Sequence, residues 1–242
     1  MASNIFLSAR WEYLVMYNYE VDPAILKPYL PPFTELDLYN NKAIVSVVGF
    51  MFNNTKVLGI KWPGFVNFEE VNLRYYVKYF DGKEWKRGAA FISEIVPKFL
   101  VSSIANFCYN EHYSVAKMSH AIIHNEQELE VTYNWKKKNQ ECNTMWTKAS
   151  AQPVDIDPNS EEEFIFEHYF GYNKLNETTT IEYPLAHPRW QIFPVTDYKL
   201  DYNVEQLYGA EFVPFMQNIK PRSVFLAKGS NVNVKFPAKI YS

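Results

Sequence analysis

The sequence has few cysteines and few glycines. Its 242 residues include two cysteines, Cys108 and Cys142, which form no CxxC pair and provide no disulfide framework. The eight glycines form no glycine-rich phosphate loop, no dinucleotide fingerprint and no GxSxG nucleophile motif. We therefore expect no nucleotide cofactor, and the sequence indicates no other cofactor.

Charge of one sign and long apolar runs are also scarce. The net charge is −3 without a large charged block, which gives no electrostatic reason to expect binding to nucleic acid or to an anionic membrane. The only basic run, Lys136–Lys138, is interpreted as the solvated tip of a hairpin. The longest apolar run, Ala43–Phe52, is too short to span a bilayer, and Arg10 and Glu12 argue against a signal peptide. We expect a soluble cytoplasmic protein.

Aromatic residues, in contrast, are abundant. The chain contains 18 Tyr, 18 Phe and 6 Trp, and such residues favour β-structure. About ten β-type runs, separated by few and short helical segments, predict a mainly β protein. We expect a closed or nearly closed antiparallel β-barrel with short peripheral helices, formed by residues 1–242 as one domain. Its last two strands, Ser223–Ala227 and Asn231–Phe236, are expected to form a hairpin around Gly229.

The clearest β-pattern lies between Phe68 and Glu94. Phe68–Phe80 alternates with period two, so Val71 and Leu73 point to one side of a strand and the residues between them to the other. Asp81-Gly82 then provides a tight turn, because glycine accepts positive φ. We predict that Phe68–Phe80 and Trp85–Glu94 pair as antiparallel neighbours.

Three polar residues, Glu70, Asn72 and Arg74, share one face of the first of these strands. They either line the interior of a barrel or lie on an ordinary solvent-facing side of a sheet. If they are buried, the two charged groups must be paired or solvated, because an unpaired buried charge is costly. Glu94 stands in an apolar sequence and is expected to be partly buried.

Lys98 follows Pro97 where the second strand gives way to a segment with helical spacing. A lysine in apolar surroundings has a lowered pKa, and its neutral amine is a nucleophile toward carbonyl groups. The alternative is a lysine at a helix start whose amine reaches solvent.

Histidines give no metal site. His120 and His124 lie on a predicted strand, where residues four apart are separated by about 13 Å and cannot chelate one ion. His187-Pro188-Arg189-Trp190 and His168–Tyr172 combine polar groups with aromatic rings. Both segments either line a ligand pocket or form packed turns.

Several motifs resemble those of the YqjF-like family of bacterial proteins, over nearly the whole chain. They are Tyr19–Leu26, Leu30-Pro31, Glu35–Asp37, Phe68–Arg74, Glu94–Lys98, His187–Trp190 and Leu207–Gly209. That family is similar in turn to acetoacetate decarboxylase, whose fold is a cone-shaped antiparallel β-barrel that encloses a ligand cavity. The resemblance implies such a barrel for this chain.

The resemblance to the decarboxylase also implies roles for residues. Lys98 stands where that enzyme has its Schiff-base lysine, and Glu70 and Glu94 stand where it has two glutamates. The enzyme's Pro-Lys-Lys reads Pro97-Lys98-Phe99 here, and its cavity arginine would fall near Asn18 or Tyr19. Without a second lysine, and with carboxylates nearby, Lys98 is expected to stay protonated.

We therefore expect the barrel to bind a small organic molecule with a carbonyl or carboxylate group. Candidate ligand-binding residues are Asn72, Arg74, His187, Arg189 and Trp190, and candidate catalytic residues are Lys98, Glu70 and Glu94. One alternative is a Schiff-base decarboxylase or lyase that uses Lys98, which borohydride trapping of a keto acid would reveal. Another is a non-catalytic structural or interaction protein with a closed barrel. The sequence leaves the oligomeric state open, a homo-oligomer included.

Overall fold

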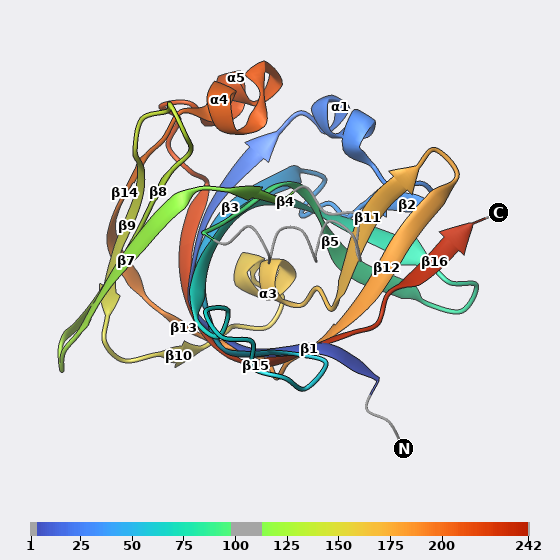
Figure 1. The fold of residues 1–242 in the computed structure, drawn as a ribbon. Coiled ribbons are helices and arrows are strands. Elements are labelled where there is room, and N and C mark those ends of the chain that lie inside the picture. The colour runs from blue at the N-terminus through green and yellow to red at the C-terminus, as the bar shows by residue number, and fades with distance from the viewer. Residues whose placement is uncertain (1–3, 98–112, 242) are drawn as a thin grey trace.

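The computed structural model describes residues 4–97 and 113–241 and shows a mainly β architecture (Figure 1). The strands are β1 (Ile5–Val21), β2 (Thr34–Leu36), β3 (Ala43–Val57), β4 (Phe68–Phe80), β5 (Trp85–Val96), β6 (Tyr113–Val115), β7 (Lys117–His124), β8 (Glu128–Lys136), β9 (Asn143–Ser150), β10 (Val154–Asp155), β11 (Phe170–Asn176), β12 (Thr179–Ala186), β13 (Gln191–Phe193), β14 (Val195–Asp201), β15 (Ser223–Lys235) and β16 (Ala238–Tyr241). The helices are α1 (Pro23–Leu26), α3 (Glu161–Phe166), α4 (Val204–Tyr208) and α5 (Val213–Met216), with 3-10 turns η1 (Lys27–Tyr29) and η2 (Ala210–Phe212).

The large sheet closes on itself. Its strands follow the order β15-β1-β3-β4-β5-β11-β12, and β12 pairs with β15 through Leu185 opposite Val234. Most neighbours are antiparallel, including the predicted pair β4 and β5. The joint between β5 and β11 is parallel, with Phe170 opposite Gly88. A Cβ at Gly88 would lie 2.5 Å from the Phe170 carbonyl oxygen, so the joint needs glycine there. The predicted closed β-barrel is confirmed, with one parallel joint.

A second sheet, in the order β14-β9-β8-β7, covers the outer face of β3 and β4. Val71 and Leu73 of β4 belong to the same buried cluster as Val131 and Tyr133 of β8. The apolar face of β4 is therefore the outer face of the barrel, buried against another sheet. Its polar face must point inward.

Helix α3 lies inside the outline of the ring in Figure 1, whereas α1, α4 and α5 lie outside it as predicted. The α3 residues Phe164, Ile165 and Phe166 pack with the inner face of β1 and β3, including Met16 and Phe50. Ser160 caps the N-terminus of this helix, because its hydroxyl accepts a hydrogen bond from the Glu163 amide. The barrel interior is thus partly filled by a short helix.

The predicted C-terminal hairpin is wrong, because Ser223–Lys235 forms one continuous strand. Gly229 has the expected positive φ of 77°, but it lies opposite Glu12 in the β1–β15 ladder. A Cβ there would lie 2.0 Å from the Trp11 carbonyl oxygen, so glycine allows close contact with an irregular part of β1. The helix expected after Pro97 falls outside the described residues. Within 4–97 and 113–241, no helix is long and apolar enough to cross a bilayer.

Candidate functional site

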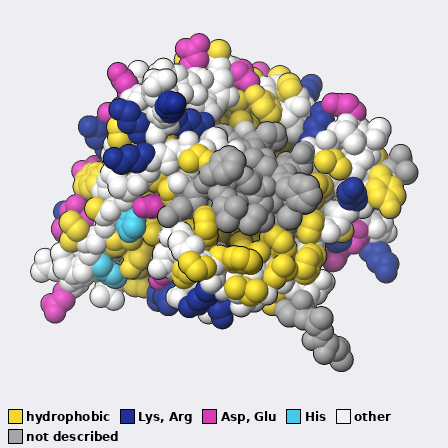
Figure 2. Space-filling view, viewed as in Figure 1, with side chains coloured by type: hydrophobic (Ala, Val, Ile, Leu, Met, Phe, Trp, Pro, Cys, Tyr) yellow, Lys and Arg dark blue, Asp and Glu magenta, His cyan; other side chains and the backbone are white. Residues whose placement is uncertain are grey.

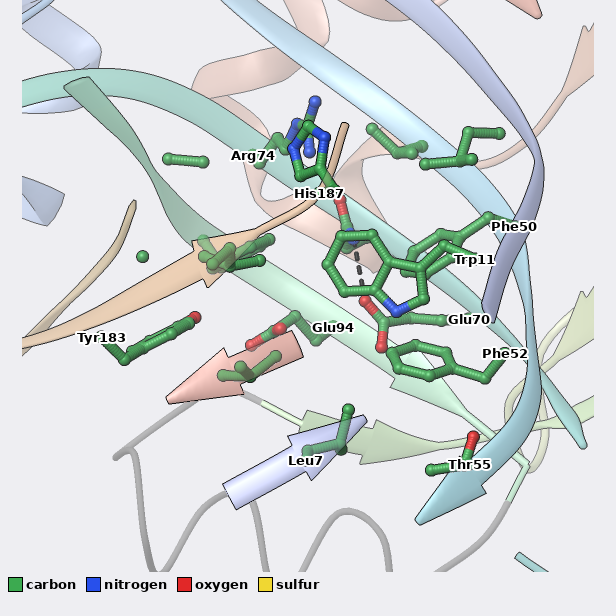
Figure 3. Close-up of a pocket in the computed structure, with 18 of the residues that line it drawn as sticks. Leu7, Trp11, Phe50, Phe52, Thr55, Glu70, Arg74, Glu94, Tyr183 and His187 are labelled. Carbon is green, nitrogen blue, oxygen red and sulfur yellow. Dashed lines mark hydrogen bonds between the residues drawn. The ribbon is translucent and has the colours of Figure 1, made fainter. Parts of the chain in front are cut away.

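A cavity of about 150 Å³ lies inside the barrel, between α3 and the inner faces of β1, β3 and β4 (Figure 3). Most of its wall is apolar and rich in aromatic rings, among them Trp11, Phe50, Phe52, Phe68, Phe91 and Trp190. Polar groups are few. The main ones are Glu70, Asn72, Arg74, Glu94, His168 and His187.

The β4 residues Glu70, Asn72 and Arg74 all line this cavity. Glu70 is 3% exposed and Asn72 is 2% exposed, and Glu94 of β5 lies directly opposite Asn72. The interior alternative for this strand face is confirmed, and the solvent-facing alternative is wrong. Period-two alternation brings the three side chains to one side, and closure of the ring encloses them.

Glu70 is held in place by two hydrogen bonds. Its Oε1 accepts from Asn72 Nδ2 at 2.9 Å and its Oε2 accepts from the Tyr113 hydroxyl at 2.9 Å. Burial raises the pKa of Glu70 to about 7, against the opposing effects of these bonds and of the Arg74 charge. This carboxyl therefore changes charge near neutral pH.

Among the described residues that line the cavity, Arg74 is a positively charged one and forms no ion pair. Its Nε donates to the Tyr76 hydroxyl at 3.4 Å and its Nη2 lies 3.6 Å from Met16 Sδ. Among residues 4–97 and 113–241, no carboxylate lies within ion-pair distance of this guanidinium. Glu70 is close enough for its pKa to respond to Arg74, but the two are not bonded. Arg74 is partly buried and its guanidinium has no carboxylate partner among the described residues, so this cation is available to an anion that enters the cavity.

A chain of hydrogen bonds runs behind Arg74 through the barrel wall. The Ser46 hydroxyl donates to Asn18 Oδ1 at 2.6 Å, so the Tyr76 hydroxyl must donate to Ser46, at 2.7 Å. Asn18 Nδ2 donates to Ser223 at 3.0 Å, and Ser223 donates to Glu161 on α3. Every donor points from Arg74 toward the Glu161 carboxylate. The chain fixes the Tyr76 oxygen as an acceptor for the Arg74 Nε.

His168 belongs to a second polar cluster at the cavity. Its Nε2 donates to Asp37 Oδ2 at 3.1 Å, and Arg87 Nε donates to the same oxygen at 2.6 Å. Burial lowers the pKa of His168 to about 4, although the bond to Asp37 opposes the shift. Burial also opposes ionisation of Asp37, but the bonds from His168 and Arg87 outweigh it and lower the Asp37 pKa. The imidazole is neutral at pH 7, and its buried Nδ1 has no hydrogen-bond partner in the described part of the chain.

His187 and Trp190 connect the polar and aromatic parts of the wall. Their rings stack at 4.2 Å, and Trp190 in turn lies 6.4 Å from Trp11. Trp11 contacts Phe50 at 5.1 Å between ring centroids. Figure 3 shows His187 beside Arg74, above Trp11 and Phe50. Burial lowers the pKa of His187, so this imidazole also favours its neutral form.

The aromatic lining continues to the molecular surface through the segment between β3 and β4. Trp62 and Phe65 of this segment line the cavity, and Trp62 is 48% exposed. Leu58 and Ile60 beside them are exposed as well. Figure 2 shows hydrophobic side chains gathered below the centre of the ring on this face of the molecule.

Six of the predicted ligand-binding or catalytic residues line the same cavity: Glu70, Asn72, Arg74, Glu94, His187 and Trp190. Arg189 is not part of the lining: its Nη2 pairs with Glu163 Oε1 at 2.7 Å and its side chain is 45% exposed. Lys98 lies outside the described residues, so its role stays a prediction. No group of three or more His, Cys, Asp or Glu within the described ranges could hold a metal ion.

Sequence reasoning missed the cluster of Asp37, Arg87 and His168. His168 was considered as a pocket residue, but Arg87 was not, and Asp37 appeared only within a family motif. Asp37 and His168 are 131 positions apart, and no local pattern joins them. The sequence therefore contains no signal that these residues lie together.

The barrel has the fold of acetoacetate decarboxylase-like enzymes. The acetoacetate decarboxylase of Legionella pneumophila matches with a TM-score of 0.63 at 14% identity, over 96% of this chain and 86% of that chain. An acetoacetate decarboxylase-like enzyme from Sphingomonas wittichii RW1 matches with a TM-score of 0.64 at 12% identity, over 98% and 93%. The enduracididine biosynthesis enzyme MppR, complexed with pyruvate, matches with a TM-score of 0.63 at 12% identity, over 97% and 89%. At these identities the likeness establishes the fold and no activity.

The chain itself belongs to the DUF2071 family, described as an uncharacterized conserved protein, whose model matches residues 8–231. The uncharacterized protein YqjF of Bacillus subtilis (strain 168) is 37% identical over 70 residues. That alignment covers 28% of this chain and 29% of the relative, so less than a third of either protein is compared. The predicted resemblance to YqjF and to the acetoacetate decarboxylase-like fold is confirmed.

Proposed function

We propose that the protein binds a small organic anion, a carboxylate or keto acid, in the barrel cavity with Arg74 as the anchor. The observation that carries this proposal is a cavity-lining guanidinium without an ion pair among the described residues. A planar guanidinium forms two parallel hydrogen bonds with a carboxylate, and such charge-assisted bonds are the stronger ones in proteins.

Glu70 and Asn72 supply the polar contacts beside this anchor. A protonated Glu70 removes a negative charge from the cavity and can donate a hydrogen bond to a ligand oxygen. The buried Asn72 Oδ1 has no partner in the described residues and can accept from a ligand hydroxyl. Related folds support the same ligand chemistry, since one neighbour is an acetoacetate decarboxylase and another is complexed with pyruvate.

The proposal is tested by titrating wild-type protein and Arg74→Gln with acetate, pyruvate, acetoacetate and phenylacetate in a calorimeter. We expect at least one of these anions to bind wild type and to bind Arg74→Gln about 10- to 100-fold more weakly, as for the loss of a charged hydrogen bond. The free energy of unfolding should change by less than about 1 kcal/mol, because no carboxylate in the described part of the chain is paired with Arg74. Arg10→Gln, which removes an exposed arginine paired with Glu12, is the matched control. Equal affinities in wild type and Arg74→Gln would contradict the proposal.

A further inference from the structure

Along β4, the cavity wall carries the cation Arg74 toward one end and a stacked pair of aromatic rings at the other. The inner faces of β3 and β4 pair in rows: Ser46 lies opposite Arg74, Val48 opposite Asn72, and Phe50 opposite Glu70. In the next row Phe52 lies opposite Phe68, and their rings stack at 4.7 Å. A ligand aligned along β4 therefore meets a cation at one end and aromatic rings at the other.

The aromatic part forms a continuous wall rather than scattered rings. Trp11 of β1 contacts three of them, with ring centroids at 5.1 Å from Phe50, 5.5 Å from Phe52 and 6.4 Å from Trp190. These contacts are tilted or edge-on, the arrangements in which aromatic rings attract one another. Another flat ring placed against this wall would find both faces and edges to contact.

The volume of the cavity limits the size of that ring. A cavity of about 150 Å³ with apolar walls is large enough for one benzene-sized ring. One such ring fills this volume, whereas an acid of two to four carbons would leave the aromatic wall without a partner.

From these observations we propose that the ligand is a monocyclic aryl carboxylic acid, with its carboxylate on Arg74 and its ring against Trp11, Phe50 and Trp190. The inference rests on the proposed function and adds the chemical class of the ligand. The ring excludes water from the cation, which strengthens the ion pair at Arg74. The apolar body and the charged head of such an acid match the two ends of the cavity.

The test is a calorimetric comparison of phenylacetate with five analogues that each change one property. Cyclohexylacetate has a ring that is not flat, and phenylacetamide has no charge. 2-Naphthylacetate has a second fused ring, whereas acetate and acetoacetate have no ring. We expect phenylacetate to bind at least threefold more tightly than cyclohexylacetate and at least tenfold more tightly than each of the others. In Arg74→Gln, the difference between phenylacetate and phenylacetamide should disappear.

A second pair of variants tests the aromatic wall. Phe50→Leu should weaken phenylacetate at least threefold while leaving the affinity for acetate unchanged. Phe80→Leu, on the exposed end of the same sheet, is the matched control and should change neither.

The outcomes separate the two proposals. If acetate or acetoacetate binds more tightly than phenylacetate, and does so only with Arg74 present, the aryl class is wrong and the anion site stands. If no carboxylate shows binding that depends on Arg74, both are wrong. Equal affinity for phenylacetate and phenylacetamide in wild type also overturns the assignment of the carboxylate to Arg74.

Discussion

Glu70 and His168 both line the cavity, and burial shifts their pKa values in opposite directions. Glu70 titrates near 7 in the folded protein instead of near 4.5, and His168 near 4 instead of near 6.5. Between pH 4.5 and 7, folding therefore takes up a proton at Glu70, and stability falls as pH rises. Between pH 4 and 6.5, folding releases a proton at His168, and stability rises with pH. The two contributions largely cancel in the wild-type profile.

The difference between wild type and Glu70→Gln isolates the Glu70 contribution. Relative to the variant, wild type should lose about 3 kcal/mol of unfolding free energy between pH 4.5 and 7.5, from a shift of roughly 2.5 pKa units. Glu70 faces Asn72 and Arg74 on its own strand, Tyr113 on β6 and Glu94 on β5. Urea unfolding at several pH values measures the difference.

Glu126→Gln, at an exposed turn position, is the control for this measurement, and its difference from wild type should stay small over the same range. A flat difference for Glu70→Gln as well would mean that Glu70 stays ionised in the folded protein.

At the residue scale, the sequence predicted Glu70, Asn72 and Arg74 on one face because strand alternation is a local property. The sequence did not decide whether this face points into the barrel or to solvent. The direction depends on closure of the barrel and on the second sheet packed outside β4. Whether Arg189 lines the cavity, as predicted for a ligand-binding residue, also depends on tertiary structure. Its neighbour Trp190 turns toward the cavity, while Arg189 pairs with Glu163.

Between elements, the hydrogen-bonded chain from Tyr76 to Glu161 ties β4, β3, β1, β15 and α3 together. Its central residues Ser46 and Asn18 are fully buried. Each hydroxyl or amide in the chain is both donor and acceptor, so removal of one group takes one hydrogen bond from each of its two neighbours.

Ser46→Ala should therefore destabilise the protein by about 1–3 kcal/mol, the usual cost of leaving buried polar groups unsatisfied. It should also weaken carboxylate binding, because the Tyr76 oxygen that accepts from Arg74 loses its orientation. Denaturant unfolding and calorimetry measure the two effects. Ser119→Ala, at an exposed position on β7, is the matched control. A Ser46→Ala variant as stable as Ser119→Ala would show that the chain contributes little.

At the element scale, the sequence predicted the strands and the turn between two of them better than the path of the chain between elements. The Asp81-Gly82 turn was predicted because it is specified within a few residues. The sequence predicted a hairpin where β15 is one continuous strand. A glycine with positive φ, here Gly229, occurs in β-bulges as well as in turns. The position of α3 inside the ring follows from packing against β1 and β3, and its six residues carry no signal for it.

For the whole molecule, the barrel provides the cavity, and the chain assembles one site there from distant segments. Trp11, Arg74, His168 and Trp190 come from four separate regions of the sequence and line one cavity. The sequence predicted the barrel and its class, since hydrophobic patterning and family motifs are spread over the chain. It could not predict the unpaired state of Arg74, which depends on the absence of a carboxylate from every described neighbouring element.

A crystal structure of the protein soaked with phenylacetate would show directly whether Arg74 anchors a carboxylate inside the barrel. We expect ligand density inside the ring, with both carboxylate oxygens within about 3 Å of the Arg74 guanidinium nitrogens. A cavity without ligand density at saturating phenylacetate, or a carboxylate bound away from Arg74, would contradict the proposal.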